Sequence, residues 1–304
     1  MTAMTMRDKA EYIMRESIQR VMPGPAVVTA LQKCKFSEGR LYLVAVGKAA
    51  WEMANSAVQC LDKKVCAGIV LTKYGHVQGP IKDVACYEAG HPVPDENSLR
   101  GTQAILQMIT GLEEQDTVLF LLSGGGSSLF EQPFIPLEEL REITAQLLAC
   151  GASITEMNTI RKHLSQVKGG RFAVMCKPAH ITSIILSDVI GDQIDMIASG
   201  PTCGDSSSCA DAIAIVEKYP LTLSPLAQKA LQLETPSEVI NATNIITGSV
   251  SKLCEYAKDV CTTLGYDVTI LTDCMTCEAR EAGRFLGSIA RTHATTSEHL
   301  AFLA

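Results

Sequence analysis

The chain alternates short, continuously apolar segments with longer segments of helical periodicity, and no other feature of the sequence restricts the fold as strongly. Apolar segments without a polar face are typical of strands buried on both sides, and they occur at 41–46, 68–71, 84–87, 117–122 and 180–186. Between them, residues 97–109 and 137–148 show the spacing of amphipathic helices. The alternation predicts an α/β fold: a doubly wound, Rossmann-like parallel sheet with helices on both faces.

The two ends of the chain depart from this central pattern. A helix over residues 11–21 should end before Pro23, because Pro-Gly-Pro stops it. Prolines interrupt the pattern again between residues 220 and 236, so we expect a first domain at 1–236 and a second at 237–304. The second shows one βαβα unit, with strands at 243–248 and 266–271 and helices at 250–264 and 278–290. Because one such unit is too small for a stable domain, we expect it to begin an α/β domain that remains incomplete.

Composition limits the class of protein and its partners. Apolar residues make up 47% of the chain and charged residues 19%, as in a folded protein, and no apolar segment approaches the roughly 20 residues of a membrane-spanning helix. The formal charge of −7 and the lack of a basic stripe argue against nucleic acid as a partner. The N-terminus has no basic stretch followed by an apolar block, so we expect a cytoplasmic protein.

The cysteines are scattered singly through predicted helices and strands, which favours reduced thiols over a disulfide framework. Cys274 and Cys277 form the one C-x-x-C pair. No second pair of cysteines or histidines at metal-binding spacing accompanies them. We therefore interpret the pair as structural and assign no metal to it.

Ligands of open parallel sheets bind outside the carboxyl ends of the strands, so polar residues at these ends are candidate site residues. Gly47 and Lys48 follow the apolar segment 41–46. Glycine permits a sharp turn there, and a lysine at the start of a helix adds positive charge to N–H groups that bind phosphate. The loop is not a Walker A motif, because Ala49 replaces the Ser or Thr that binds magnesium. The alternative for Lys48 is a solvated surface lysine.

A glycine-rich loop follows 117–122, the strongest predicted strand. Its residues combine hydroxyl groups with bare backbone: Ser123, Gly124, Gly125, Gly126, Ser127 and Ser128. Backbone N–H groups in such a loop can converge on an anion, so we predict a substrate or phosphate site; a flexible turn is the alternative. A dinucleotide-binding fingerprint is disfavoured, because Leu129 stands in place of its third glycine.

Further polar residues occur at helical spacing between residues 158 and 171. Asn158, Arg161 and Ser165 would share one helix face, and the planar fork of Arg161 suits a carboxylate. A solvated basic helix is the alternative. We interpret His163 as a structural hydrogen-bonding residue and not as a catalyst.

Two acidic residues, Asp188 and Asp192, follow the apolar segment 180–186. Acids at the tip of an apolar strand are costly unless they bind magnesium, pair with a cation or take a proton. Asp188 is the stronger candidate because it lies closer to the end of the strand. Asp192 either joins a metal site or only supports the turn.

These segments together resemble the glycerate kinases of the GckA/TtuD type, which carry a C-terminal MOFRL domain. The resemblance rests, in order along the chain, on VAVGKAA, LLSGGGSSL, MNTIRKHLSQVKGGR, LSDVIGDQIDMIASGPT and NIITGSV. It implies a Rossmann-like N-terminal domain, a second α/β domain, and transfer of the γ-phosphoryl group of ATP to D-glycerate, usually at the 2-hydroxyl. Lys48 is then the essential lysine, the loop 123–128 part of the substrate and phosphate site, and Arg161 and Lys168 anion contacts.

The mechanism expected on this basis is direct phosphoryl transfer with ATP and Mg²⁺. Lys48 would neutralise the migrating phosphoryl group, the loop amides would hold oxygens, and Asp188 would bind magnesium or accept the hydroxyl proton. Family members continue into a glycine-rich C-terminal region, so we expect a chain that lacks most of that region and can form a homodimer through its uncovered surface. Two alternatives remain open: an NAD(P)-dependent hydroxypyruvate reductase, and a truncated, non-catalytic binder of small anions.

Overall fold

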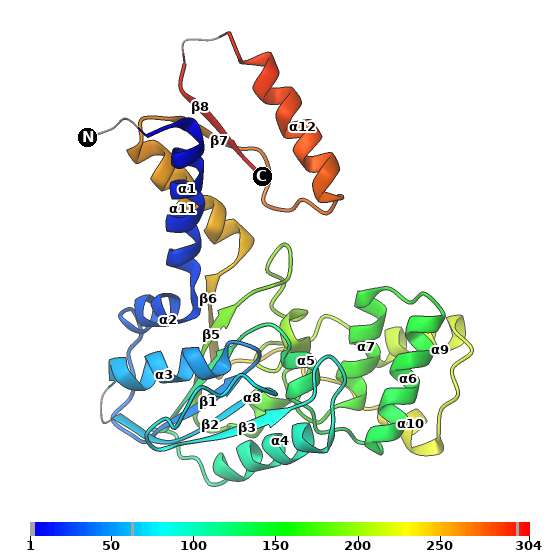
Figure 1. Ribbon diagram of the computed structural model, residues 1–304. Coiled ribbons are helices and arrows are strands. Elements are labelled where there is room, and N and C mark those ends of the chain that lie inside the picture. Colours follow the sequence, from blue (N-terminus) through cyan, green and yellow to red (C-terminus); the bar gives the residue numbers. More distant parts are fainter. Residues whose placement is uncertain (1–3, 62–63, 296–297) are drawn as a thin grey trace.

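Six strands form one parallel sheet in the computed structural model, which describes residues 4–61, 64–295 and 298–304 (Figure 1). The strands of this sheet are β1 (Leu41–Val46), β2 (Val65–Lys73), β3 (Val84–Ala89), β4 (Thr117–Leu122), β5 (His180–Leu186) and β6 (Ala242–Gly248). Their spatial order is β3-β2-β1-β4-β5-β6, and every neighbouring pair is parallel. This is the order of a doubly wound, Rossmann-type sheet, so the predicted fold class is confirmed.

Helices cover both faces of the sheet (Figure 1). One face is covered by α2 (Pro23–Leu31) and α3 (Ala50–Leu61), and the other by α4 (Glu96–Met108), α5 (Gly126–Leu129) and α8 (Arg171–Met175). Strand β4 shows the consequence for the sequence: Leu119 and Leu121 pack toward α2 and α3, whereas Val118, Phe120 and Leu122 pack on the opposite side. A strand buried on both faces therefore has no polar face.

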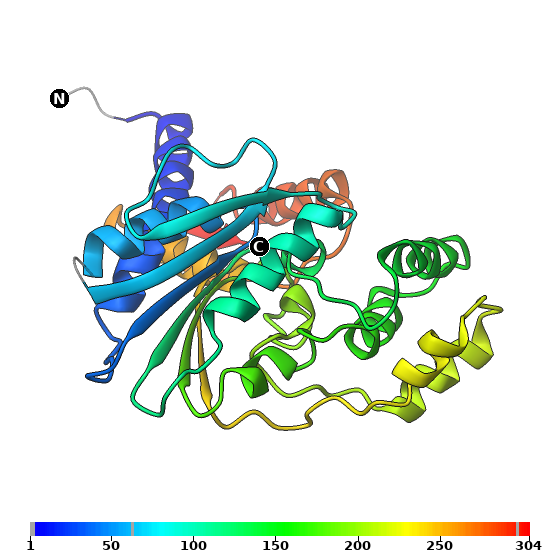
Figure 2. The same ribbon diagram turned by 90° about the horizontal axis from the view of Figure 1, so that it is seen from below.

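Four helices pack on one another beside the sheet and not on one of its faces (Figures 1 and 2). They are α6 (Leu137–Ala149), α7 (Ile154–Leu164), α9 (Cys209–Lys218) and α10 (Pro225–Ala230). Their apolar stripes enclose a separate core, which includes Leu147 of α6, Ile160 of α7 and Ala227 of α10. We refer to these four helices as the helical unit. The alternation of strands and helices in the sequence did not indicate it.

The C-terminal segments lie apart from the sheet and contact the N-terminal helix. They are α11 (Val250–Thr263), β7 (Asp267–Ile270), α12 (Ala279–Thr292) and β8 (Leu300–Leu303). Strands β7 and β8 form a separate parallel pair, and α1 (Met6–Val21) packs along α11 (Figure 1). No helix in the described ranges is long and apolar enough to span a membrane.

One expectation about these ends needs correction. The strand expected at 243–248 does not open a second unit, because β6 pairs with β5 and completes the main sheet. Helix α1 ends at Val21 as expected, but Pro23 begins α2 at once, since a proline in the first turn of a helix loses no hydrogen bond. The division into domains at residue 236 stays a prediction. Cys274 and Cys277 are exposed thiols, so this pair does not contribute to core packing.

Candidate functional site

The loops after β1 and β4 meet at the point where the sheet changes its direction of winding. These strands are neighbours, but β1 leads to α3 on one face and β4 to α5 on the other. The backbone N–H of Lys48 donates to the carbonyl oxygen of Gly124 at 2.9 Å, and the N–H of Ala49 donates to Ser123 Oγ at 3.0 Å. Sheets of this kind bind ligands at such a switch point. The first two predicted segments therefore form one site.

Glycine is required in this site because other parts of the chain approach its backbone closely. Gly125 has a φ of +91°, and a Cβ atom there would lie 2.9 Å from Cδ2 of His91 and 3.3 Å from Cγ of Lys48. A Cβ atom on Gly124 would overlap with the carboxylate of Asp188. Two residues without side chains are thus surrounded by Lys48, His91 and Asp188. Three ionisable groups therefore lie around a loop whose backbone is not covered by side chains.

The amides of this loop are available to a ligand. Within the described ranges, the N–H groups of residues 124–127 donate no hydrogen bond to protein, whereas those of Ser123 and Ser128 donate to carbonyl oxygens. Backbone N–H groups that are exposed side by side attract anions. A loop of this kind can hold phosphate or carboxylate oxygens, and its role as a substrate or phosphate site stays a prediction.

A cavity of about 830 Å³ opens beside this loop, between the carboxyl edge of the sheet and helices α6 and α7. Six of the predicted residues line it: Gly125, Ser127, Ser128, Asn158, Arg161 and Asp188. The wall formed by α6 and α7 combines apolar residues such as Leu148, Ile154 and Met157 with the polar residues Asn158 and Arg161. The cavity therefore has polar groups both at the glycine loop and toward the helical unit.

Helix α7 brings Asn158 and Arg161 into the cavity wall. The helix begins at a capping box in which Ser153 and Glu156 bond each other's backbone N–H groups, and this fixes the start of the helix. The guanidinium of Arg161 makes no hydrogen bond to any described residue, and burial lowers its pKa while Glu131 opposes that change. A partly buried guanidinium whose donors are all available suits a planar anion.

Lys168 has a different position from the one expected. Its ammonium group is fully buried and donates to Glu131 Oε2 at 2.6 Å and to the carbonyl oxygen of Phe130 at 2.7 Å. Ser165 donates to the other oxygen of Glu131 at 2.6 Å. Burial lowers the pKa of Lys168, and Glu131 opposes that change. Lys168 therefore is not placed to contact an anionic ligand. It fixes the position of the segment behind the glycine loop.

Besides Lys168, six predicted residues do not line the cavity: Gly47, Lys48, Ser123, Gly124, Gly126 and Asp192. Gly47 has a φ of +120°, and a side chain there would overlap with Ser123, which is itself buried and accepts the hydrogen bond from Ala49. Both residues shape the loop, and it is their neighbours that can contact a ligand. Asp192 has a φ of +52° and lies near Lys252. The pKa of Lys252 is raised mainly by the hydrogen bond to Glu255 and to a smaller extent by the charge of Asp192. Asp192 does not line the cavity that Asp188 lines, and its part in a metal site stays a prediction. Gly126 packs against Ala198 in the 3-10 helix η2 (Ile197–Ser199).

Sequence reasoning missed His91, Lys73 and Glu131. His91 follows β3 and Lys73 ends β2, so the rule that points to carboxyl ends of strands could have found both. Burial lowers the pKa of His91, and the charges of Lys48 and Lys73 lower it further, which favours a neutral imidazole beside the loop. No local pattern distinguishes Glu131, because its role depends on Lys168, which lies far away in sequence.

Comparisons with known proteins identify the family of this chain. A family described as "Domain of unknown function (DUF4147)" matches residues 9–232. The D-glycerate 2-kinase of Thermotoga maritima is 50% identical over 94% of this chain and 69% of its own length. A crystal structure of a glycerate kinase from Thermotoga maritima superimposes with a TM-score of 0.93 and 47% identity, over 98% of this chain and 73% of that one.

A relative from Agrobacterium vitis is 40% identical over 83% of this chain and 58% of its own length, and it bears the provisional name hydroxypyruvate reductase. The similarity to the Thermotoga maritima proteins is higher and extends over more of both chains. By sequence and by structure, this chain belongs to the glycerate kinase family.

Proposed function

We propose that the protein transfers the γ-phosphoryl group of ATP to the 2-hydroxyl group of D-glycerate. The observation that carries the proposal is the arrangement at the sheet's switch point, where Lys48, His91 and Asp188 surround a glycine loop whose amides are available. Phosphoryl transfer requires mainly positioning and neutralisation of charge, and this site supplies both. The names of the relatives from Thermotoga maritima support the same reaction.

Each end of the two substrates has a matching group in the cavity or in the loop beside it. The carboxylate of glycerate fits Arg161, whose planar fork can donate two parallel hydrogen bonds, with Asn158 one helical turn away. The phosphate oxygens of ATP fit the amides of residues 124–127 and the ammonium of Lys48. A cavity of about 830 Å³ lies in the range that holds drug-sized ligands, so it has room for a nucleotide as well as for a three-carbon acid.

The chemical step follows from these positions. The 2-hydroxyl oxygen of glycerate forms a bond to the γ-phosphorus, and the bond from that phosphorus to the bridging oxygen of ADP breaks. Lys48 neutralises charge on the transferring group, and the carboxylate of Asp188 accepts the proton of the hydroxyl group. The side chain of Asp188 makes no hydrogen bond to a described residue and is exposed, so it can accept this proton.

The residues present also fit a magnesium ion bound together with ATP. Magnesium usually takes one or two carboxylates and completes its shell with phosphate oxygens and water. As the alternative to its role as proton acceptor, Asp188 would supply the carboxylate, since it lies against the glycine loop where the phosphates are expected. The ion would neutralise phosphate charge.

The proposal is tested by incubating the protein with ATP, Mg²⁺ and D-glycerate and identifying the product by phosphorus NMR, which separates 2-phosphoglycerate from 3-phosphoglycerate. The Thermotoga maritima D-glycerate 2-kinase serves as the positive control. Formation of 2-phosphoglycerate with loss of one ATP per product is the expected result. A parallel incubation with NAD(P)H and hydroxypyruvate tests the reductase alternative, and oxidation of the nucleotide there without phosphorylation in the first assay would refute the kinase assignment.

A further inference from the structure

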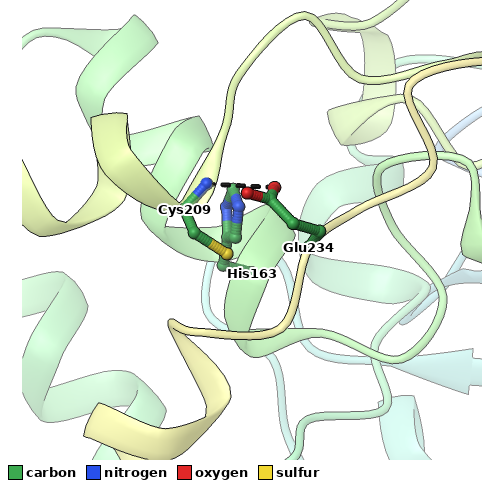
Figure 3. A group of neighbouring side chains, drawn as sticks. All are labelled: His163, Cys209 and Glu234. Atoms are coloured by element: carbon green, nitrogen blue, oxygen red, sulfur yellow. Dashed lines mark hydrogen bonds between the residues drawn. The ribbon is translucent and has the colours of Figure 1, made fainter.

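Three side chains converge within the helical unit, away from the glycine loop (Figure 3). They are His163 of α7, Cys209 at the start of α9, and Glu234 in the segment that follows α10. One ligand atom from each, a ring nitrogen, a sulfur and a carboxylate oxygen, lies within 4.8 Å of the other two. The proposed kinase chemistry uses none of these residues.

His163 is oriented in a way that its packing alone does not explain. Its ring is completely buried, and Nδ1 lies 2.9 Å from the carbonyl oxygen of Thr159. A carbonyl oxygen only accepts, so Nδ1 carries the proton and the neutral ring leaves a lone pair on Nε2. Within the described ranges Nε2 has no hydrogen-bond partner. A buried acceptor without a partner costs about 1–3 kcal/mol, which a ligand at this position would remove.

The other two groups lie close to the ring of His163. Glu234 accepts a hydrogen bond from the backbone N–H of Cys209 at 3.1 Å, which ties the carboxylate to the start of α9. Arg171 donates to the carbonyl oxygens of Leu233 and Glu234 at 2.9 and 3.3 Å and so fixes the backbone of that segment. The three groups therefore come from three separate segments that these hydrogen bonds hold together.

We propose that His163, Cys209 and Glu234 form a site for a divalent transition-metal ion of the zinc class. Imidazole nitrogen, thiolate and carboxylate are the ligands that zinc takes in proteins, and a protonated Nδ1 bonded to a backbone carbonyl is the usual support of a metal-binding histidine. Ligand atoms of a tetrahedral zinc site lie about 3.4–3.8 Å apart for bonds of about 2.0–2.3 Å. Glu234 is exposed and Cys209 is partly exposed, so both can close the remaining gap, while the buried His163 stays in place.

A catalytic pair of cysteine and histidine is disfavoured by the same geometry. In such a pair an acid orients the histidine from the ring nitrogen that does not face the sulfur. If Nε2 faces the sulfur, the orienting nitrogen is Nδ1, and that atom is bonded to the carbonyl oxygen of Thr159 instead of to an acid. The metal site has a structural consequence instead: it ties α7, which also carries Asn158 and Arg161, to α9 and to the segment after α10.

The experiment measures zinc binding by the purified full chain. After removal of metal, the protein should bind about one equivalent of Zn²⁺, and Co²⁺ should give the near-ultraviolet absorption of a cobalt–thiolate bond. Cys209→Ser should remove that absorption, and Cys209→Ser or Glu234→Gln should weaken Zn²⁺ binding by at least about tenfold. Zn²⁺ should raise the unfolding temperature of the unmodified chain and have little effect on that of the Cys209→Ser variant.

Matched controls distinguish this site from other thiols and from unfolding. Cys66→Ser and Glu238→Gln change exposed residues of the same types and should leave Zn²⁺ binding unchanged. Circular dichroism in metal-free buffer should show that the Cys209→Ser and Glu234→Gln variants keep their fold. Binding that survives Cys209→Ser but is lost on Cys274→Ser would assign the metal to the C-x-x-C pair and overturn the proposal. Absence of stoichiometric binding by the folded, unmodified chain would overturn it too.

Discussion

Replacing Arg161 tests the proposed placement of glycerate most directly. The guanidinium lines the cavity and makes no hydrogen bond to a described residue, so both arms of its fork are available to the substrate carboxylate. A hydrogen bond to a charged group contributes about 1.5–3 kcal/mol. Because the site is partly exposed, we take the lower value for each of two bonds, which totals about 3 kcal/mol. With a tenfold change for each 1.4 kcal/mol, Arg161→Met should raise the KM for D-glycerate roughly 150-fold.

The same reasoning predicts what should not change. Since Arg161 has no hydrogen-bonded protein partner to lose, Arg161→Met should leave the unfolding temperature nearly unchanged and affect the KM for ATP little. Arg161→Lys keeps the charge but loses the fork, so its KM for glycerate should lie between those of the unmodified protein and Arg161→Met.

Steady-state kinetics with each substrate varied in turn measures these effects. Arg284→Met is the matched control, because it removes an exposed arginine that pairs with Glu281 on α12, outside the cavity. A KM for glycerate within twofold of the unmodified value in Arg161→Met, or a large rise in the KM for ATP instead, would refute the placement of the carboxylate at Arg161.

Three further predictions concern the loop and the stability of the sheet. Lys48→Met should lower kcat about a thousandfold in the kinase assay while thermal unfolding stays unchanged, because the side chain is exposed; near-normal turnover would exclude its assigned role. Gly125→Val should abolish ATP binding measured by calorimetry, since a Cβ atom would meet His91 and Lys48 at a φ of +91°, and unchanged affinity would show that the loop is only a turn. The hydrogen bond from Arg40 lowers the pKa of Asp116 from 3.8 to about 2, so its stabilisation is present above about pH 4 and is lost as the pH falls toward 2. This loss should amount to about 1–2 kcal/mol, less than the full shift implies because Arg40 is half exposed, and denaturant unfolding of Asp116→Asn should show a smaller decrease over that range.

The sheet itself could be predicted because burial on both faces leaves a direct record in the sequence. Strands β4 and β5 begin and end where their apolar segments do, and the glycine loop follows β4 as expected. Glycine at 125 is likewise explained by a local requirement, a positive φ beneath two neighbouring side chains. Patterns of this kind report whether a segment is buried and how its backbone must bend.

What only the tertiary structure decided is which segments become neighbours. The apolar pattern of β6 suits a strand of the main sheet or a strand of a second sheet. Its partner depends on which sheet edge is available after the chain has passed through the helical unit, and in the structure this partner is β5. The family resemblance implied an anion contact for Lys168, but its environment is set by Glu131. Lys48, His91 and Asp188 follow three different strands, and they meet only because β1, β3 and β5 end at the same edge of the sheet. Local periodicity contains no information about such long-range contacts, since these are determined by the packing of the whole chain.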